Sequence, residues 1–231
     1  MTDDPATTDD PMMTDDATTG SDETAGDTTA AGDNKTTSDT VAAADDETTS
    51  DTVAAGDGVA KRVVVTGTPG TGKTAATEQL ESGIDAEVIH LNDEIREHDL
   101  YTDRDADRDS LVTDLDAARD HLGEWHGVLE SHLAHHFDAD RVVVLRCEPS
   151  ALADRLESQG ESTATASENA ESEALDVVLS EAVDRHGQES IYEIDTTDRK
   201  PAAVADEIRA VRDGDREPTA GTVDFTGYLV G

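Results

Sequence analysis

The pattern of apolar and polar positions changes near residue 60, where short apolar runs begin to alternate with helical periodicities. Runs rich in Val, Ile and Leu predict five strands, at 62–67, 86–91, 126–131, 140–147 and 190–195. Apolar residues at helical spacing predict helices at roughly 73–83, 92–98, 114–122, 149–158, 167–185 and 200–212. Several strands are apolar at nearly every position, which is typical of strands covered on both faces. The alternation predicts an α/β domain with a five-stranded parallel sheet flanked by helices.

The stretch before this domain has a different composition. Residues 1–58 are rich in Asp, Thr and Ala, and an eight-letter run, TTSDTVAA, occurs twice in them. A segment of this kind has no apolar face to bury, so we expect 1–58 to be a disordered acidic tail that serves solubility or binds a partner. The domain is then expected at 59–212. The C-terminal tail, 213–231, contains a small apolar cluster that either packs on the domain edge or contacts a partner.

Acidic residues outnumber basic ones by 55 to 17, which gives a formal net charge of -38. The tail carries 16 acids and one base, so -23 remains on the other residues and the excess is spread along the chain. Molar salt shortens the screening length to roughly 3 Å and removes most of this repulsion, so a salt-loving host is expected. Such a charge argues against direct DNA binding, because phosphate contacts need a basic surface.

Cys147 is the single cysteine, which excludes an intrachain disulfide and favours a reducing compartment. No apolar run approaches the length of a membrane span, and the first residues lack the pattern of a secretory signal. We therefore expect a cytoplasmic protein without membrane contact.

Residues 67–74 read Gly-Thr-Pro-Gly-Thr-Gly-Lys-Thr and match the phosphate-binding pattern G-x-x-x-x-G-K-S/T between a predicted strand and a predicted helix. Glycines let backbone N–H groups turn toward phosphate oxygens, and the helix N-terminus favours an anion. Lys73 would reach the β- and γ-phosphates of ATP, and the Thr74 hydroxyl would bind Mg²⁺. The predicted nucleotide-binding residues are Gly67, Gly70, Gly72, Lys73, Thr74 and Ala75.

A loop of this kind also needs an acid near the metal, usually at the end of a neighbouring strand. Glu130 is the first candidate and Asp195 the second, although either can be a solvated strand-end carboxylate. The nearby His132, His135 and His136 have helical spacing but lack a second ligand cluster, so zinc binding there is disfavoured.

Six segments in order resemble one family, the small adenylate kinases of archaea and the eukaryotic nucleus. They are GTPGTGKT at 67–74 and the segments at 88–114, 130–136, 142–156, 167–182 and 192–197. Members combine nucleoside monophosphate kinase and ATPase activity with a role in late maturation of the small ribosomal subunit. The resemblance implies a monophosphate-binding insert at about 90–116 and a short lid at about 159–169.

The resemblance also implies roles for particular residues. Asn92 and Arg96 would face the acceptor nucleotide, with an ion pair between Arg96 and a neighbouring acid as the alternative. The family's D-x-H element reads Glu130-Ser-His132 here, so Glu130 would position the metal and His132 would couple the acceptor side to the ATP side.

The lid departs from the family. Arg155 matches the first lid-flanking arginine and would hold ATP, but residues 159–169 contain no basic residue. Phosphoryl transfer would then be slower or rely on Arg146 and Arg155, and the share of ATP hydrolysis would rise.

These features favour an enzyme that transfers a phosphoryl group from ATP to AMP, or to a broader set of monophosphates, with Mg²⁺ and with ATPase activity. The role in small-subunit maturation would involve a basic ribosomal protein as partner. The alternatives are an ATPase assembly factor with little kinase activity and a kinase for another small molecule.

Overall fold

A computed structural model describes residues 58–83, 85–105 and 110–230. The expected acidic tail, 1–58, lies outside the described residues except for Gly58, so its proposed disorder and role stay predictions. Among the described helices, none is long and apolar enough to cross a membrane.

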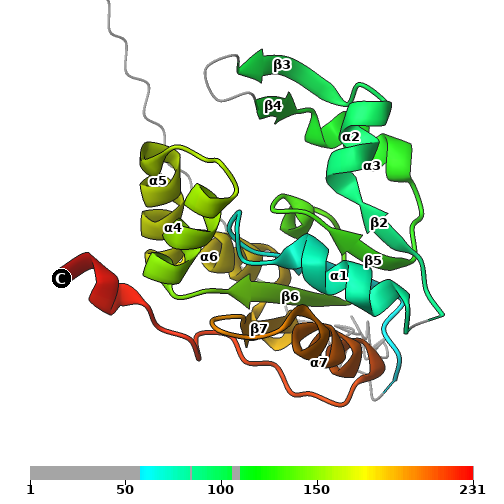
Figure 1. Ribbon diagram of the computed structural model, residues 1–231. Helices are drawn as coiled ribbons and strands as arrows, with labels where there is room; N and C mark the ends of the chain where they lie inside the picture. The colour runs from blue at the N-terminus through cyan, green and yellow to red at the C-terminus, as the bar shows by residue number, and fades with distance from the viewer. Residues whose placement is uncertain (1–57, 84, 106–109, 231) are drawn as a thin grey trace, which may run out of the picture. The chain divides into compact units, whose positions relative to one another are not determined.

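The five predicted strands form one sheet. They are β1 (Arg62–Thr66), β2 (Val88–His90), β5 (Gly127–Glu130), β6 (Arg141–Arg146) and β7 (Ile191–Asp195), in the order β2-β5-β1-β6-β7 (Figure 1). Every pairing in this sheet is parallel. The prediction of a five-stranded parallel sheet flanked by helices is confirmed.

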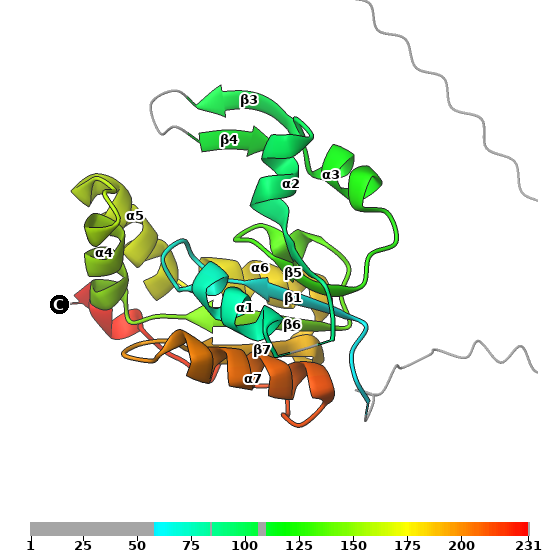
Figure 2. The same ribbon diagram turned by 45° about the vertical axis from the view of Figure 1, so that its right-hand side comes forward.

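Helices cover both faces of the sheet. They are α1 (Lys73–Glu81), α2 (Leu91–Glu97), α3 (Leu115–Leu122), α4 (Pro149–Ser158), α5 (Thr163–Ala174), α6 (Val177–His186) and α7 (Pro201–Asp213). Alternate residues of β1 point to opposite faces: Val63 and Val65 pack with α1 and α7, and Val64 packs with α2, α3 and α6. Figure 2 shows α1 and α7 together on one side of the sheet and α6 on the other. Because the helices cover the two faces of the sheet, a ligand site is expected at the carboxyl ends of the strands.

One predicted helix, 167–185, is two helices in the structure. The break falls at Leu175 and Asp176, where Asp176 has a left-handed backbone with φ of 55°. Asp tolerates this conformation better than most residues, because its short polar side chain bonds locally. Here the Asp176 carboxylate pairs with Arg146, which apolar periodicity does not reveal.

A second sheet was not predicted. Strands β3 (Tyr101–Asp105) and β4 (Ser110–Thr113) pair antiparallel and project beyond α2 in Figure 2. Their charged residues lack the apolar alternation of a half-buried strand, so the pattern gave no strand signal. The expected insert, 90–116, contains α2 and this hairpin, and α3 continues the same region to Leu122.

The C-terminal segment runs along the sheet edge. The Thr219 backbone N–H donates to the Ile191 carbonyl at 2.9 Å, and the Thr222 N–H donates to Glu193 Oε2 at 2.7 Å. The short 3-10 helix η3 (Thr226–Val230) follows, and the Phe225 ring lies 5.5 Å from the Arg146 guanidinium carbon. The structure thus places this segment against β7 and Arg146, while Val230 stays 86% exposed.

Candidate functional site

The loop from Gly67 to Gly72 joins β1 to α1 at the carboxyl end of the sheet. Gly67 has φ of 140°, and a Cβ there would lie 2.4 Å from the Leu145 carbonyl oxygen, so only glycine fits. Gly70 packs against Leu156 of α4, and Thr71 closes the turn by donating from Oγ1 to the Thr68 carbonyl at 2.9 Å. The loop is therefore fixed by its neighbours before any ligand arrives.

Helix α1 begins at Lys73, directly after this loop. Its first intrahelical bond runs from the Ala76 N–H to the Gly72 carbonyl at 3.1 Å. The N–H groups of Lys73, Thr74 and Ala75 therefore have no partner within the helix, and together with the helix dipole they suit an anion. This is the geometry of a phosphate-binding site.

The Lys73 side chain is buried at the centre of the loop. Its Nζ donates to the carbonyl oxygens of Gly67 at 2.9 Å and Thr68 at 3.1 Å. Burial lowers the pKa of Lys73 to about 8, against the opposing effect of Glu130 and Glu173. A bound phosphate would add negative charge beside the ammonium and favour its charged form.

Thr74 and Glu130, the predicted metal-binding pair, come together. The Thr74 hydroxyl donates to Glu130 Oε2 at 3.4 Å, because β5 lies beside β1 and ends at Glu130. Thr74 is exposed and Glu130 is only 3% exposed. The Thr74 hydroxyl from the first turn of α1 and the Glu130 carboxylate from the end of β5 supply the oxygen ligands that Mg²⁺ prefers.

The alternative acid, Asp195, lies elsewhere. It ends β7, which is separated from β1 by β6, and its Oδ1 accepts bonds from the Thr197 N–H at 2.8 Å and the Thr197 hydroxyl at 2.6 Å. The geometry therefore favours Glu130 over Asp195 as the acid near the metal.

His90 was missed from the sequence, although it ends the strand beside β5. Its Nδ1 lies 2.9 Å from Glu130 Oε2 and its Nε2 lies 3.3 Å from Glu81 Oε1. Burial lowers the pKa of His90, but the hydrogen bonds and charges of Glu130 and Glu81 outweigh it and raise the pKa overall. His90 therefore holds the Glu130 carboxylate in place.

Of the three residues Glu130, Ser131 and His132, it is Ser131 that contacts the insert. Ser131 Oγ donates to Asn92 Oδ1 at 3.0 Å, whereas the His132 carbonyl accepts from the Thr66 hydroxyl at 3.2 Å. Burial, with smaller contributions from Lys73 and two histidines, lowers the pKa of His132 to about 4. His132 is therefore neutral near pH 7, and Ser131 makes the contact to α2 that the sequence did not point to.

Asn92 and Arg96, the predicted acceptor residues, both lie on α2, where Asn92 is half-buried and Arg96 is exposed. The Arg96 guanidinium donates to Asp93 Oδ1 at 3.2 Å and to the Asn92 carbonyl at 3.3 Å. An exposed ion pair of this kind contributes roughly 0.2–1 kcal/mol, so a phosphate can displace it.

Arg155 lies beside the loop, but Arg146 is not available to a phosphate. Arg155 donates to the Thr196 carbonyl at 2.9 Å, and the Thr196 hydroxyl donates to the Thr71 carbonyl at 2.9 Å. Arg146 is 1% exposed, and its nitrogens donate to three carboxylates. The expectation that Arg146 serves phosphoryl transfer is wrong, because these carboxylates use its donors.

The network around Arg146 connects the lid to the loop. Glu173 on α5 accepts from Arg146 Nε at 2.8 Å and from the Thr68 hydroxyl at 2.5 Å. Glu193 accepts from Arg146 Nη1 at 2.6 Å, and the Asp176 carboxylate pairs with Nη2. Burial lowers the pKa of Arg146, but the charges and hydrogen bonds of Glu173 and Asp176 outweigh it and raise the pKa overall. Glu173 is thus a third residue, after His90 and Ser131, that the sequence did not reveal.

The expected lid, 159–169, begins in the connection after α4 and continues into α5. No Lys or Arg occurs between Arg155 and Arg185. The end of α4, the connection that follows it and the whole of α5 therefore carry no lysine or arginine after Arg155. Arg155 remains the lid arginine that is placed beside the loop.

The disfavoured zinc site at His132, His135 and His136 does not assemble as three imidazoles among the described residues. His135 Nδ1 lies 3.0 Å from the Thr66 hydroxyl and its Nε2 lies 2.9 Å from Glu181 Oε2, so both nitrogens have partners. His136 and Glu181 lie near it, but His132 does not belong to this group.

Comparison with known proteins shows the family to which the chain belongs. Residues 63–176 match a family described as "AAA domain". A protein of Natronomonas pharaonis named "Putative adenylate kinase" is 64% identical over 169 residues, which cover 73% of this chain and 99% of that protein. Proteins of the same name from Halobacterium salinarum and Methanothermobacter thermautotrophicus are 59% and 43% identical, each over 73% of this chain and 99% of the relative. The chain belongs to this archaeal adenylate kinase-like family.

Among solved structures, a shikimate kinase from Bacteroides thetaiotaomicron aligns with a TM-score of 0.46 and 16% identity, over 66% of this chain and 98% of that one. The assignment of this chain to the adenylate kinase-like family rests on the sequence relatives. The family is consistent with the phosphate-binding loop, Lys73 and the Thr74–Glu130 pair described above.

Replacing Arg146 with Ala tests the buried network. Arg146→Ala leaves Glu173 and Glu193 buried without their cation, so we expect the free energy of unfolding to fall by about 3–5 kcal/mol. Arg185→Ala, which removes an exposed pair with Asp138, is the control and should cost less than about 1 kcal/mol. Denaturant unfolding in molar KCl measures both, and equal losses would contradict the structural role of Arg146.

Replacing Glu130 with Gln tests the metal assignment. Glu130→Gln keeps the size of the side chain but removes the charge beside Thr74, so the Mg²⁺ concentration for half-maximal nucleotide turnover should rise at least about tenfold. Asp195→Asn should leave this concentration unchanged. A larger effect at Asp195 than at Glu130 would reverse the assignment.

Proposed function

We propose that the protein transfers a phosphoryl group from ATP to AMP, directly and without a covalent intermediate. The carrying observation is that two consecutive residues at the end of β5 contact the two sides of the site. Glu130 contacts Thr74 beside the phosphate-binding loop, and Ser131 contacts Asn92 on α2. A single strand end therefore lies between the donor loop and the insert, as direct transfer between two bound nucleotides requires.

The loop N–H groups, Lys73 and Arg155 hold the triphosphate in this proposal. Mg²⁺, held by Thr74 and Glu130, would neutralise charge on the β- and γ-phosphates. Arg96 would exchange its weak pair with Asp93 for the acceptor phosphate, to which a guanidinium binds in a two-bond geometry. His132, neutral near pH 7, adds no charge beside Lys73.

ATP hydrolysis is proposed as a second activity of the same site. The lid supplies no basic residue between Arg155 and Arg185, so less positive charge surrounds the transferring phosphoryl group. Water is then excluded less effectively, which favours hydrolysis as a side reaction or as the main one.

We also propose a role in maturation of the small ribosomal subunit. It rests on the resemblance of the sequence segments and on the net charge of -38, which attracts basic proteins. A basic small-subunit protein is the expected partner, and a cytoplasmic location follows from that role.

Separate measurement of ADP and inorganic phosphate tests the activity. With ATP alone, hydrolysis yields one phosphate per ADP; in the proposed transfer, added AMP raises ADP formation without raising phosphate. Lys73→Ala should lower both activities at least about 100-fold, because the phosphates lose their nearest cation. Lys61→Ala, at an exposed lysine outside the site, is the matched control.

Two results would contradict this function. ADP formation that AMP does not change would leave an ATPase without the kinase activity. Full activity in Lys73→Ala would show that the phosphate-binding loop is not the reacting site.

Affinity purification tests the ribosomal role. The tagged full chain, bound in molar KCl with ADP or with a non-hydrolysable ATP analogue, should recover small-subunit proteins over large-subunit proteins. Large-subunit proteins are the matched control, because they are similarly basic and would be recovered equally by charge alone. Equal recovery of the two sets, or recovery of neither, would contradict the role.

A further inference from the structure

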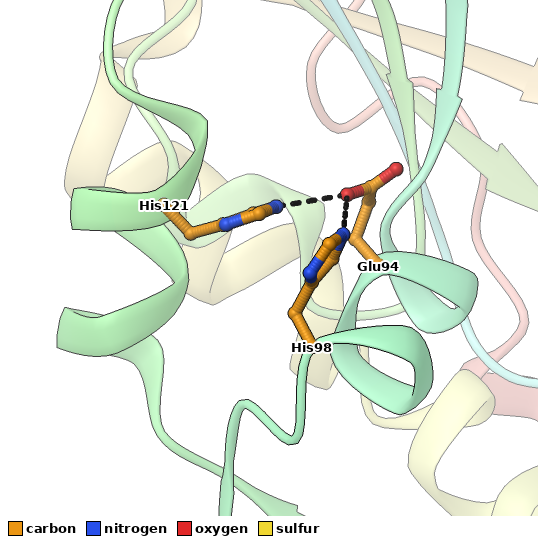
Figure 3. A group of neighbouring side chains, drawn as sticks. All are labelled: Glu94, His98 and His121. Atoms are coloured by element: carbon orange, nitrogen blue, oxygen red, sulfur yellow. Dashed lines mark hydrogen bonds and ion pairs between the residues drawn. The ribbon is translucent and has the colours of Figure 1, made fainter.

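The insert and helix α3, which continues it, carry a group of three side chains that no step of the proposed reaction uses. Glu94 lies on α2, His98 follows the last turn of α2, and His121 lies in the last turn of α3 (Figure 3). His121 Nε2 lies 3.0 Å from Glu94 Oε2, and His98 Nε2 lies 3.5 Å from the same oxygen. Both imidazoles thus direct one nitrogen at one carboxylate oxygen.

The spacing of these atoms suits a tetrahedral metal ion. In a zinc site with bonds of about 2.0–2.2 Å, neighbouring ligand atoms lie roughly 3.3 Å apart. The two nitrogen–oxygen distances, 3.0 and 3.5 Å, lie on either side of that value, and all three ligand atoms lie within 4.8 Å of one another. An ion therefore needs only small side-chain movements to enter.

The two imidazole rings lie side by side, with centroids 4.1 Å apart, and each has a nitrogen near the same Glu94 oxygen. A divalent ion satisfies both nitrogens and the carboxylate at once, with the histidines neutral. Two imidazoles and one carboxylate favour Zn²⁺ over Mg²⁺ or Ca²⁺, which prefer oxygen ligands alone.

We propose that Glu94, His98 and His121 bind one Zn²⁺ ion that joins α2 to α3. The side chains are 32%, 46% and 31% exposed, which leaves a water molecule access to the fourth ligand position. Helices α2 and α3 are separated in the chain by the β3–β4 hairpin, and apart from this group they share a core through Leu91, Ile95 and Ala118. The ion adds a second attachment at the exposed ends of the two helices.

A consequence for the reaction rests on the proposed function. Asn92 and Arg96 lie on α2, one turn or less from Glu94, so an ion at Glu94 would restrict the helix that carries the acceptor residues. Zinc binding itself does not depend on that function and is measured without nucleotide.

Calorimetric titration of the full chain with Zn²⁺, in molar potassium nitrate, tests the site. We expect one saturable equivalent, and at least tenfold weaker binding in His121→Ala and in His98→Gln. His126→Ala is the matched control, because this exposed histidine lies outside the group and should leave binding unchanged. A titration with Mg²⁺ at the same concentrations is a second control, which measures the loose association of divalent ions with the many surface acids.

Two further readouts separate a metal site from a structural role. Co²⁺ should give the intense visible absorption of a tetrahedral site in the parent protein and not in His121→Ala. A hundredfold excess of Zn²⁺ over its dissociation constant should raise the unfolding temperature by about 5 °C in the parent protein, and not in His121→Ala.

Other outcomes would overturn the proposal. If His136→Ala abolishes Zn²⁺ binding and His121→Ala does not, the ion binds at His135, His136 and Glu181 instead. Non-saturable binding of equal strength in the parent protein and in His121→Ala would show attraction to surface acids only. Because these measurements contain no nucleotide, such failures would leave the proposed kinase activity intact, just as an inactive kinase would leave the zinc site intact.

Discussion

The Arg146 guanidinium holds together the parts of the protein that surround the phosphate-binding loop. Its carboxylate partners come from β7, from α5 and from the junction between α5 and α6. One cation among three anions is unfavourable unless other donors satisfy the remaining oxygens. They do: the Cys147 N–H and the Thr68 hydroxyl donate to Glu173, and the Thr222 N–H donates to Glu193. Because Thr68 belongs to the loop, the position of α5 depends on the same network that fixes the loop.

A second chain of contacts leads from the loop to the insert, through the end of β5. His90 holds Glu130, Glu130 accepts from Thr74, and Ser131 donates to Asn92. These contacts are single hydrogen bonds at partly buried positions, whereas the Arg146 network is buried and charged. The insert is therefore attached to the loop less firmly than α5 is. Under the proposed function, this difference suits a part that would admit and release the second nucleotide.

The sequence predicts the sheet and the phosphate-binding loop closely, but it leaves Glu130 and Asp195 as alternatives and does not indicate the long-range pairs. Continuous Val and Ile runs are local signals, so the strand bounds were predicted to within a few residues. The glycine-lysine spacing is also local, so it identified Lys73 directly. The pairing of Thr68 with Glu173 spans 105 positions, and that of Arg146 with Glu173 spans 27. No local pattern indicates which of 55 acids faces a buried arginine. The break at Asp176 and the mistaken role for Arg146 have this one origin, because both involve ion pairs between Arg146 and acids far from it in sequence.

Salt acts differently on the two kinds of electrostatic contact in this chain. Ions screen exposed pairs such as Arg96 with Asp93, and they screen buried pairs such as Arg146 with Glu193 much less. The loop and α5 therefore keep their arrangement over a wide range of ionic strength. The net charge of -38 acts mainly at the surface, where repulsion among acids grows as salt falls. The exposed insert, with its weak pairs and its group of two histidines and a glutamate, is then the part whose arrangement depends most on the ions in solution.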